Sequence, residues 1–318
     1  MGKLKGIFPG LTVTLLVAII SFLTSSLHQS FDLLVISIVF GMLVSSLLGE
    51  KEVFLDGINA ALRFFLPIGI GIYGLQLEFG GAEMKFWPIV AGVFIVAFFT
   101  TYFVSRAFGL DRTLSVLLGS GMSICGASAI VVVAPLLDSK KEDTSIALIS
   151  ILTVGLTGML IYKFLPQMTG ISPLKFAILS GTTLPMFGQV KVAAAALGPE
   201  VLSLAVKLKL LRISFLIFLA CGVLFFMGRR KKRFYIPWFM VLFFVLAAAV
   251  NFSETVAGIR GAVEPVGRFS LATALAAIGL SIDVDSITDK GASPLLVVFL
   301  SWGIIVTMVF LILNVINV

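Results

Sequence analysis

The chain has 318 residues, of which 59% are hydrophobic and only 12% are charged, and its mean hydropathy is +1.15. A soluble domain carries about 25% charged residues, so this composition excludes an ordinary soluble fold and indicates a membrane protein that crosses the bilayer many times. The net charge of +7 does not indicate nucleic-acid binding, because the basic residues follow a membrane topology.

Eleven apolar segments approach the length needed to span a bilayer. In chain order they are residues 8–27, 31–49, 54–79, 86–109, 114–137, 145–165, 174–197, 202–227, 235–250, 263–282 and 294–316. The seventh is weak and interrupted, which is typical of a broken or re-entrant helix. We therefore predict an all-α polytopic membrane protein with about eleven transmembrane helices in a single transmembrane domain, residues 1–318.

The basic residues orient these spans, because cytoplasmic loops carry an excess of Lys and Arg. With a cytoplasmic N-terminus, thirteen Lys and Arg lie inside and five outside, and the strongest marker is the RRKKR run at 229–233. The pattern predicts a cell inner membrane protein with its N-terminus in the cytoplasm and its C-terminus outside. The same run would also suit anionic membrane lipids, and the two roles are compatible.

The fifth span contains the most unusual stretch, LLGSGMSICGASAIVVVAP at residues 117–135. Glycines and small polar residues fill its centre, where a plain span would be apolar. In lipid, an irregular backbone survives only when it is buried in protein or lines a cavity. The pattern favours a broken helix whose two halves meet near the bilayer midplane. The alternative is an unbroken helix that uses small residues for close packing.

A weak repeat suggests a second broken helix in the tenth span. Arg63 and Arg212 are 149 residues apart, as are Pro88 and Pro237, and each pair begins corresponding spans. Spans two to six would then match spans seven to eleven as inverted five-helix repeats, 31–170 and 171–318, preceded by an extra helix at 1–30. The crossing broken helices would be spans five and ten, as in many secondary transporters.

Candidate site residues are the polar groups at membrane depth, since a charge there usually faces a cavity or a partner. No acidic residue lies deep in the predicted spans, which favours an anionic substrate. The substrate-binding candidates are Ser123, Cys125, Gly126, Ser128, Gln189, Lys191, Lys209, Arg212, Ser270, Thr273, Gly279 and Ser281, with Arg63 as a weaker candidate. For the basic residues, the alternative is that their side chains reach the membrane surface from the span ends.

Several motifs give the chain a resemblance to a known family. ICGASAI at 124–130, KLLR at 209–212 and AAIGLSID at 276–283 resemble the YeiH-like sulfate exporter family along nearly the whole chain. The resemblance implies a fold of the bile-acid/sodium symporter and sodium/proton antiporter group, in which a panel domain and a core domain move relative to each other. It also adds Thr182 and Thr183 to the candidates.

The chain departs from that family at one place. Where the family commonly has His-Asp, this sequence has Pro185 and Met186, and its sole histidine, His28, lies between the first two spans. A histidine titrates near neutral pH and could carry a coupling proton. Coupling through that family histidine is therefore not expected here.

These observations predict a secondary active transporter of a small anion, sulfate or a sulfonate-like compound, that works by alternating access. The alternatives are a sodium- or proton-coupled transporter of cations or organic acids with the same fold and, less favoured, a non-transporting membrane subunit. No motif assigns a catalytic nucleophile or a metal, so an enzyme is not expected. We expect no cofactor beyond a coupling Na⁺ or H⁺ and no nucleic-acid partner, and the sequence fits a homodimer and a monomer equally well.

Overall fold

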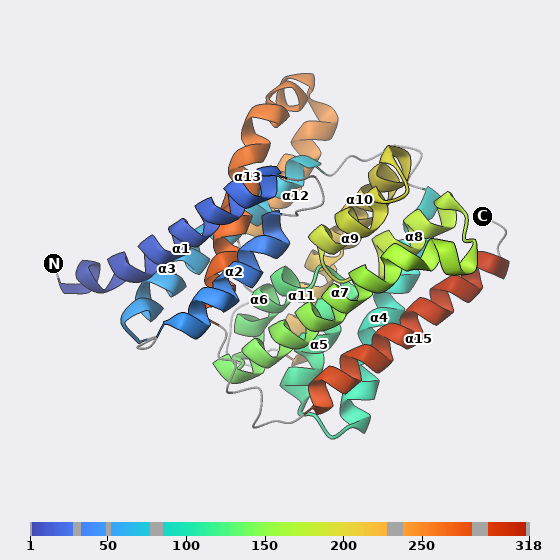
Figure 1. The fold of residues 1–318 in the computed structure, drawn as a ribbon, viewed down its shortest axis with the longest axis horizontal. Helices are drawn as coiled ribbons and strands as arrows, with labels where there is room; N and C mark the ends of the chain where they lie inside the picture. The colour runs from blue at the N-terminus through green and yellow to red at the C-terminus, as the bar shows by residue number, and fades with distance from the viewer. Residues whose placement is uncertain are drawn as a thin grey trace. The chain divides into compact units, whose positions relative to one another are not determined.

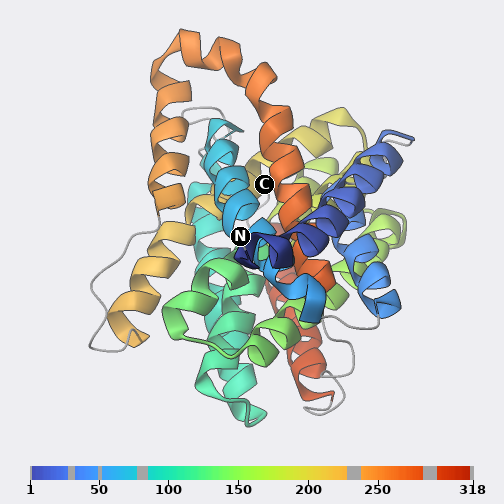
Figure 2. The same ribbon diagram turned by 90° about the vertical axis from the view of Figure 1, so that its left-hand side faces the viewer.

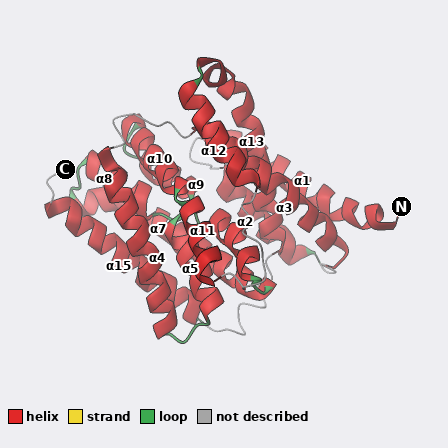
Figure 3. Ribbon diagram, turned by 180° about the vertical axis from the view of Figure 1, so that it is seen from behind, coloured by secondary structure: helices red, strands yellow, loops and turns green. Residues whose placement is uncertain are grey.

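The computed structural model describes residues 2–27, 33–48, 52–76, 85–227, 238–281 and 292–315. Within these ranges every regular element is a helix, as Figure 3 shows, which confirms the all-helical class. His28 and the basic run at 229–233 lie outside the described residues. The chain divides into two compact units, unit 1 with Met1–Phe79 and Tyr235–Val284, and unit 2 with Gly80–Phe234 and Asp285–Val318.

Unit 1 is built around one long helix. Its elements are α1 (Gly2–Leu27), α2 (Leu33–Leu47), α3 (Glu52–Tyr73), the 3-10 turn η1 (Gly74–Gln76), α12 (Trp238–Phe252) and α13 (Glu254–Ser281). Helix α13 packs against α1, α2, α3 and α12. Figure 2 shows α12 and α13, both orange, as consecutive helices joined by a tight turn. Small and branched side chains, among them Ala61 and Ala277, fill the contact between α3 and α13.

Unit 2 holds the remaining helices, labelled in Figure 1. They are α4 (Trp87–Ala107), α5 (Arg112–Ser123), α6 (Ala127–Val133), the 3-10 turn η3 (Ala134–Leu137), α7 (Lys141–Thr169), α8 (Pro173–Thr183), α9 (Phe187–Ala195), α10 (Pro199–Ser214), α11 (Leu216–Met227) and α15 (Ser293–Val315). Helix α5 lies against α4 and α7, and α8 lies against α10 and α15.

The centre of unit 2 is formed by α5 and α8, which are buried almost all round. Every residue of α5 from Leu114 to Ser123 is buried, as is every residue of α8 from Phe176 to Thr183. Both helices begin with a side-chain cap: the Leu114 N–H donates to Asp111 Oδ1 at 2.9 Å, and the Lys175 N–H donates to Ser172 Oγ at 3.4 Å. These caps satisfy amide donors that have no partner within the helix.

The expected spans correspond to these helices with one systematic difference. In the described part of the chain, six helices are long and apolar enough to cross a membrane: α1, α3, α4, α7, α13 and α15. The apolar helices α2 and α12 are shorter. The fifth, seventh and eighth expected spans are each divided into two helices: α5 and α6, α8 and α9, and α10 and α11. A polytopic helical protein is thus supported, and the number eleven stays a prediction.

The break predicted in the tenth span is wrong, because residues 263–281 belong to the continuous helix α13. Its small residues serve helix packing instead. A Cβ on Gly279 would lie 2.3 Å from the Ile38 carbonyl oxygen of α2, and one on Gly41 would lie 2.4 Å from the Ala276 carbonyl oxygen. The hydroxyls of Thr273 and Ser281 donate to carbonyls one turn earlier in the same helix. Helices in membranes associate closely through such small residues.

Gly279→Ala should therefore destabilise the protein by about 1–3 kcal/mol, since the added methyl group has to push α2 and α13 apart. Gly261→Ala on the same helix is the matched control, because nothing lies within 4 Å of its Cβ position. The control should be neutral or slightly stabilising, as alanine favours the helix. Chemical unfolding in detergent measures both variants, and equal stabilities would contradict the close packing.

Candidate functional site

Helix α5 ends at Ser123, and the chain takes three irregular residues before α6 begins at Ala127. Gly126 has φ +69°, a left-handed conformation that favours glycine. A Cβ on Gly126 would lie 2.7 Å from Met186 Cγ, so the turn also needs glycine for space. This interruption lies where the glycine-rich sequence predicts it.

A second interruption separates α8 from α9 at residues 184–186. Pro185 has no amide hydrogen, so the helix cannot continue its hydrogen bonds through it. The residue before a proline also avoids the helical conformation, and Leu184 is extended at φ −67° and ψ 132°. The proline therefore ends α8, and the contact between Gly126 and Met186 brings the two interruptions together.

Lys209 on α10 ties the two interruptions to each other. Its Nζ donates to the carbonyl oxygens of Ile124 at 2.7 Å, Leu184 at 2.8 Å and Pro185 at 2.6 Å. The side chain has no exposed surface. A lysine ammonium has three donors, so all of them are used by backbone carbonyls.

Arg212 lies one turn further along α10 on the same face and makes a parallel set of contacts. Its Nε donates to Ser123 O at 2.6 Å, one terminal nitrogen donates to Leu184 O at 3.1 Å, and the other donates to Met122 O. Arg212 is also completely buried. Since a guanidinium has five N–H groups, two remain for other partners.

The electrostatics of this cluster are unusual for a protein interior. The partners of Lys209 and Arg212 are backbone carbonyls, and neither side chain pairs with a carboxylate in the described residues. The carbonyls come from the C-terminal ends of α5 and α8, which carry partial negative charge. The helix ends thus offset the charge of the two basic side chains, and no carboxylate of the described residues does so.

Gln189 on α9 adds an unsatisfied donor to this region. Its Oε1 accepts a hydrogen bond from the Met186 N–H at 3.0 Å, which folds the side chain back over the start of α9. Its Nε2 is buried and has no hydrogen-bond partner. Gly155 of α7 makes room for it, because a Cβ there would lie 2.3 Å from the Gln189 amide. A buried amide without an acceptor is costly unless another molecule supplies one.

The other predicted residues of unit 2 lie around the same interruptions. The Cys125 Sγ and Ser128 Oγ are hydrogen-bonded to each other, and Ser128 is half-buried. The half-buried Lys191 lies over the Phe187 ring at 5.2 Å. Thr182 and Thr183 are buried at the end of α8, where both hydroxyls donate to carbonyls one turn earlier.

Five predicted residues belong to unit 1 instead: Ser270, Thr273, Gly279 and Ser281 on α13, and Arg63 on α3. Arg63 is exposed, whereas Arg212, its expected counterpart in the repeat, is completely buried. Within unit 2, the structure gathers the first interruption with the residues of α8, α9 and α10.

The break between α8 and α9 agrees with the expected interruption of the seventh span. Sequence reasoning missed the backbone carbonyls that Lys209 and Arg212 bind there, those of Leu184 and Pro185. Pro185 inside an otherwise apolar buried segment was the available signal. It also missed Tyr162 of α7, whose hydroxyl lies 2.5 Å from Thr183 Oγ1 and fixes the end of α8. Carbonyl contacts cannot be read from side-chain types.

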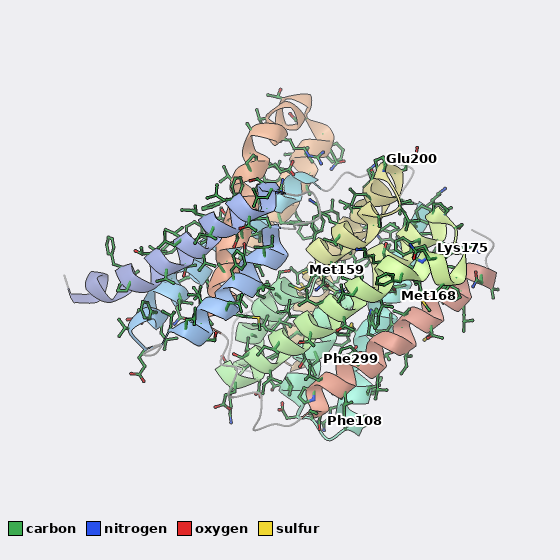
Figure 4. The ribbon with its side chains drawn as sticks, viewed as in Figure 1. Phe108, Met159, Met168, Lys175, Glu200 and Phe299 are labelled. Carbon is green, nitrogen blue, oxygen red and sulfur yellow. The ribbon has the colours of Figure 1, made fainter. Side chains whose placement is uncertain are left out.

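A pocket of about 490 Å³ lies elsewhere in unit 2, lined by Leu174, Glu200 and Ser203 among others. Figure 4 shows Lys175 and Glu200 at the same end of this unit, where α8 and α10 begin. None of the predicted site residues lines this pocket. Among the described residues, no group of three or more His, Cys, Asp or Glu could hold a metal ion.

Arg212→Met should destabilise the protein by about 2–5 kcal/mol, because the Met122 and Ser123 carbonyls would lose their buried donors. Arg106→Met is the control, since Arg106 is exposed and donates to a single carbonyl, that of Leu110. The control should change stability little. Chemical unfolding in detergent measures the stability of both variants. Equal losses of stability in Arg212→Met and Arg106→Met would contradict a stabilising role for the buried contacts of Arg212.

Comparison with known proteins places the chain among membrane proteins. A family model described as "Conserved hypothetical protein 698" matches residues 9–298. A protein of Archaeoglobus fulgidus named "UPF0324 membrane protein" is 31% identical over 96% of this chain and 92% of its own length. A protein of the same name from Bacillus cereus is 28% identical over 91% of this chain and 86% of its own length.

No solved structure matches the chain. The names of these relatives, together with the six apolar helices of spanning length, support a multi-pass membrane protein. Because the family model covers most of its length, the chain belongs to the UPF0324 membrane protein family.

Proposed function

We propose that the protein is a secondary active transporter of a small anion, with sulfate and small sulfonates as the first candidates, and that it is not an enzyme. The observation that carries the proposal is the pair of completely buried cations, Lys209 and Arg212, at the crossing of two interrupted helices. Interrupted helices at membrane depth are the usual substrate sites of secondary transporters.

Charge favours an anion over a cation as the substrate. Lys209 and Arg212 have no carboxylate partner in the described residues, so the region around the crossing has a positive potential. A cation entering it would be repelled, whereas an anion would offset the excess charge. Arg212 has two N–H groups left, and a guanidinium matches the geometry of an oxyanion.

Two further groups support an anion site at the start of α9. The Gln189 Nε2 is a buried donor without an acceptor, and it lies within the first turn of this nine-residue helix. The N-terminal end of a helix has free N–H groups and partial positive charge. An oxyanion would supply the acceptor that Gln189 lacks, and Ser128 and Cys125 would line the other interruption.

The proposal includes a topology. Eleven spans result if each divided pair of helices is counted once, with the N-terminus in the cytoplasm, the C-terminus outside and the protein in the cell inner membrane. The two five-helix repeats, residues 31–170 and 171–318, would then have opposite orientations in the membrane, because each holds an odd number of spans. The resemblance to sulfate exporters supports the substrate class.

Thermal unfolding of the purified protein against sulfate, sulfite, small sulfonates and carboxylates tests the proposal. A bound anion raises the apparent stability according to its concentration over its dissociation constant. Gln189→Leu should weaken this stabilisation about tenfold in apparent affinity, the value of one buried hydrogen bond to a charged group. Uptake of the responding anion into proteoliposomes then separates transport from binding alone.

Asn251→Leu on α12 is the control for the loss of a side-chain amide, because its Nδ2 donates to Ala247 O within its own helix. Its anion response should equal that of the wild type. An unchanged response in Gln189→Leu would remove Gln189 from the site. A wild-type protein that binds and transports none of these anions would favour a non-transporting membrane subunit.

A further inference from the structure

The two interruptions create a cage of five backbone carbonyls. The carbonyls of Met122, Ser123 and Ile124 lie at the C-terminal end of α5. Those of Leu184 and Pro185 lie at the C-terminal end of α8. None of the five can be satisfied by continuing its helix. Buried carbonyls without donors are costly, so the cage needs a positively charged or hydrogen-bonding occupant.

Carbonyl cages of this kind bind cations in other transporters. Unwound backbone and half-helix C-terminal ends coordinate Na⁺ at the substrate site, where the ion completes the crossing. Such a site selects a compact positive charge that can approach several oxygens at once. A protein that supplied this charge from its own chain would have no need of the ion.

Lys209 meets these requirements. Its ammonium is a compact charge with three donors, and it reaches Ile124, Leu184 and Pro185 at 2.6–2.8 Å from both halves of the cage. Arg212 fills the rest of the cage through Ser123 and Met122. Two side chains of one helix therefore close the cage, and backbone carbonyls accept all three Lys209 donors.

We propose that the Lys209 ammonium is a tethered cation: it occupies the position at the helix crossing where a coupling ion such as Na⁺ would otherwise bind, so the crossing forms without a metal cation. One consequence rests on the proposed function: transport would not depend on a Na⁺ gradient. Its structural part stands on the contacts of Lys209 alone.

Replacing the tethered charge by a free one tests the proposal. Lys209→Ala removes three carbons and the ammonium group, which is the size of n-propylammonium. Thermal unfolding of this variant in detergent is compared in n-propylammonium, sodium and tetramethylammonium chloride at equal ionic strength. We expect n-propylammonium to raise the unfolding temperature by about 3 °C or more above tetramethylammonium, which has no N–H donor, and Na⁺ to give a smaller rise.

Lys207→Ala is the matched control, because Lys207 lies on the same helix and is only half-buried. It should respond equally to all three salts, and so should the wild type, whose cage is already filled. A folded Lys209→Ala that does not distinguish n-propylammonium from tetramethylammonium would overturn the proposal.

The wild-type protein decides the matter where Lys209→Ala does not fold. Equal unfolding temperatures in sodium and tetramethylammonium chloride support the tethered cation, and a Na⁺-specific rise overturns it. The anion panel is read separately. Cation results that support the tethered cation, together with no response to any anion, would refute the proposed function and leave the role of Lys209 intact.

Discussion

The structure of unit 2 depends on one constraint: the carbonyl groups at the ends of α5 and α8 must find donors where no water is available. Lys209 and Arg212 provide these donors from a single face of α10. This fixes the position of α10 beside α8 and the points at which both helices stop. Two buried charges would normally destabilise a fold, but here the helix ends and the hydrogen bonds compensate them. Specific contacts therefore hold the two interruptions in place, as hydrogen bonds hold the regular helices.

The same contacts set the chemical character of the site. Because carbonyls rather than carboxylates hold Lys209 and Arg212, their charge is screened without being cancelled. A carboxylate partner for each of the two side chains would have left a site without net charge. The remaining N–H groups of Arg212 and the unpaired Nε2 of Gln189 are all donors. Charge and hydrogen bonding are thus consistent with the ligand class of the proposed function, small anions with several acceptor oxygens.

The sequence predicts part of this arrangement, and its clearest failure is the tenth span. The glycine-rich turn at Gly126 follows from residue types at membrane depth, whereas for Lys209 and Arg212 the sequence left burial and surface exposure open, and the structure shows both buried. The tenth span was predicted to break because it also contains small and polar residues, yet in α13 they allow close packing on α2. Small residues can serve either a helix break or close helix packing. In α13 the packing partner that decides between the two is Gly41 of α2, which lies far away in the sequence. Pro185 is the better signal, since a proline removes a helical hydrogen bond wherever it stands.

In the proposed function, the uncancelled charge also explains how substrate and movement would be coupled. A net positive charge is costly at membrane depth, so a unit that exposes its empty site to a less polar environment meets an electrostatic barrier. A bound anion lowers this barrier by offsetting the charge of Lys209 and Arg212. Because Lys209 is part of the chain and three carbonyls hold its ammonium group in place, this charge stays at the site when the substrate leaves. The empty carrier would then reorient more slowly than the loaded one, a bias that arises from the fixed charge and needs no titrating histidine.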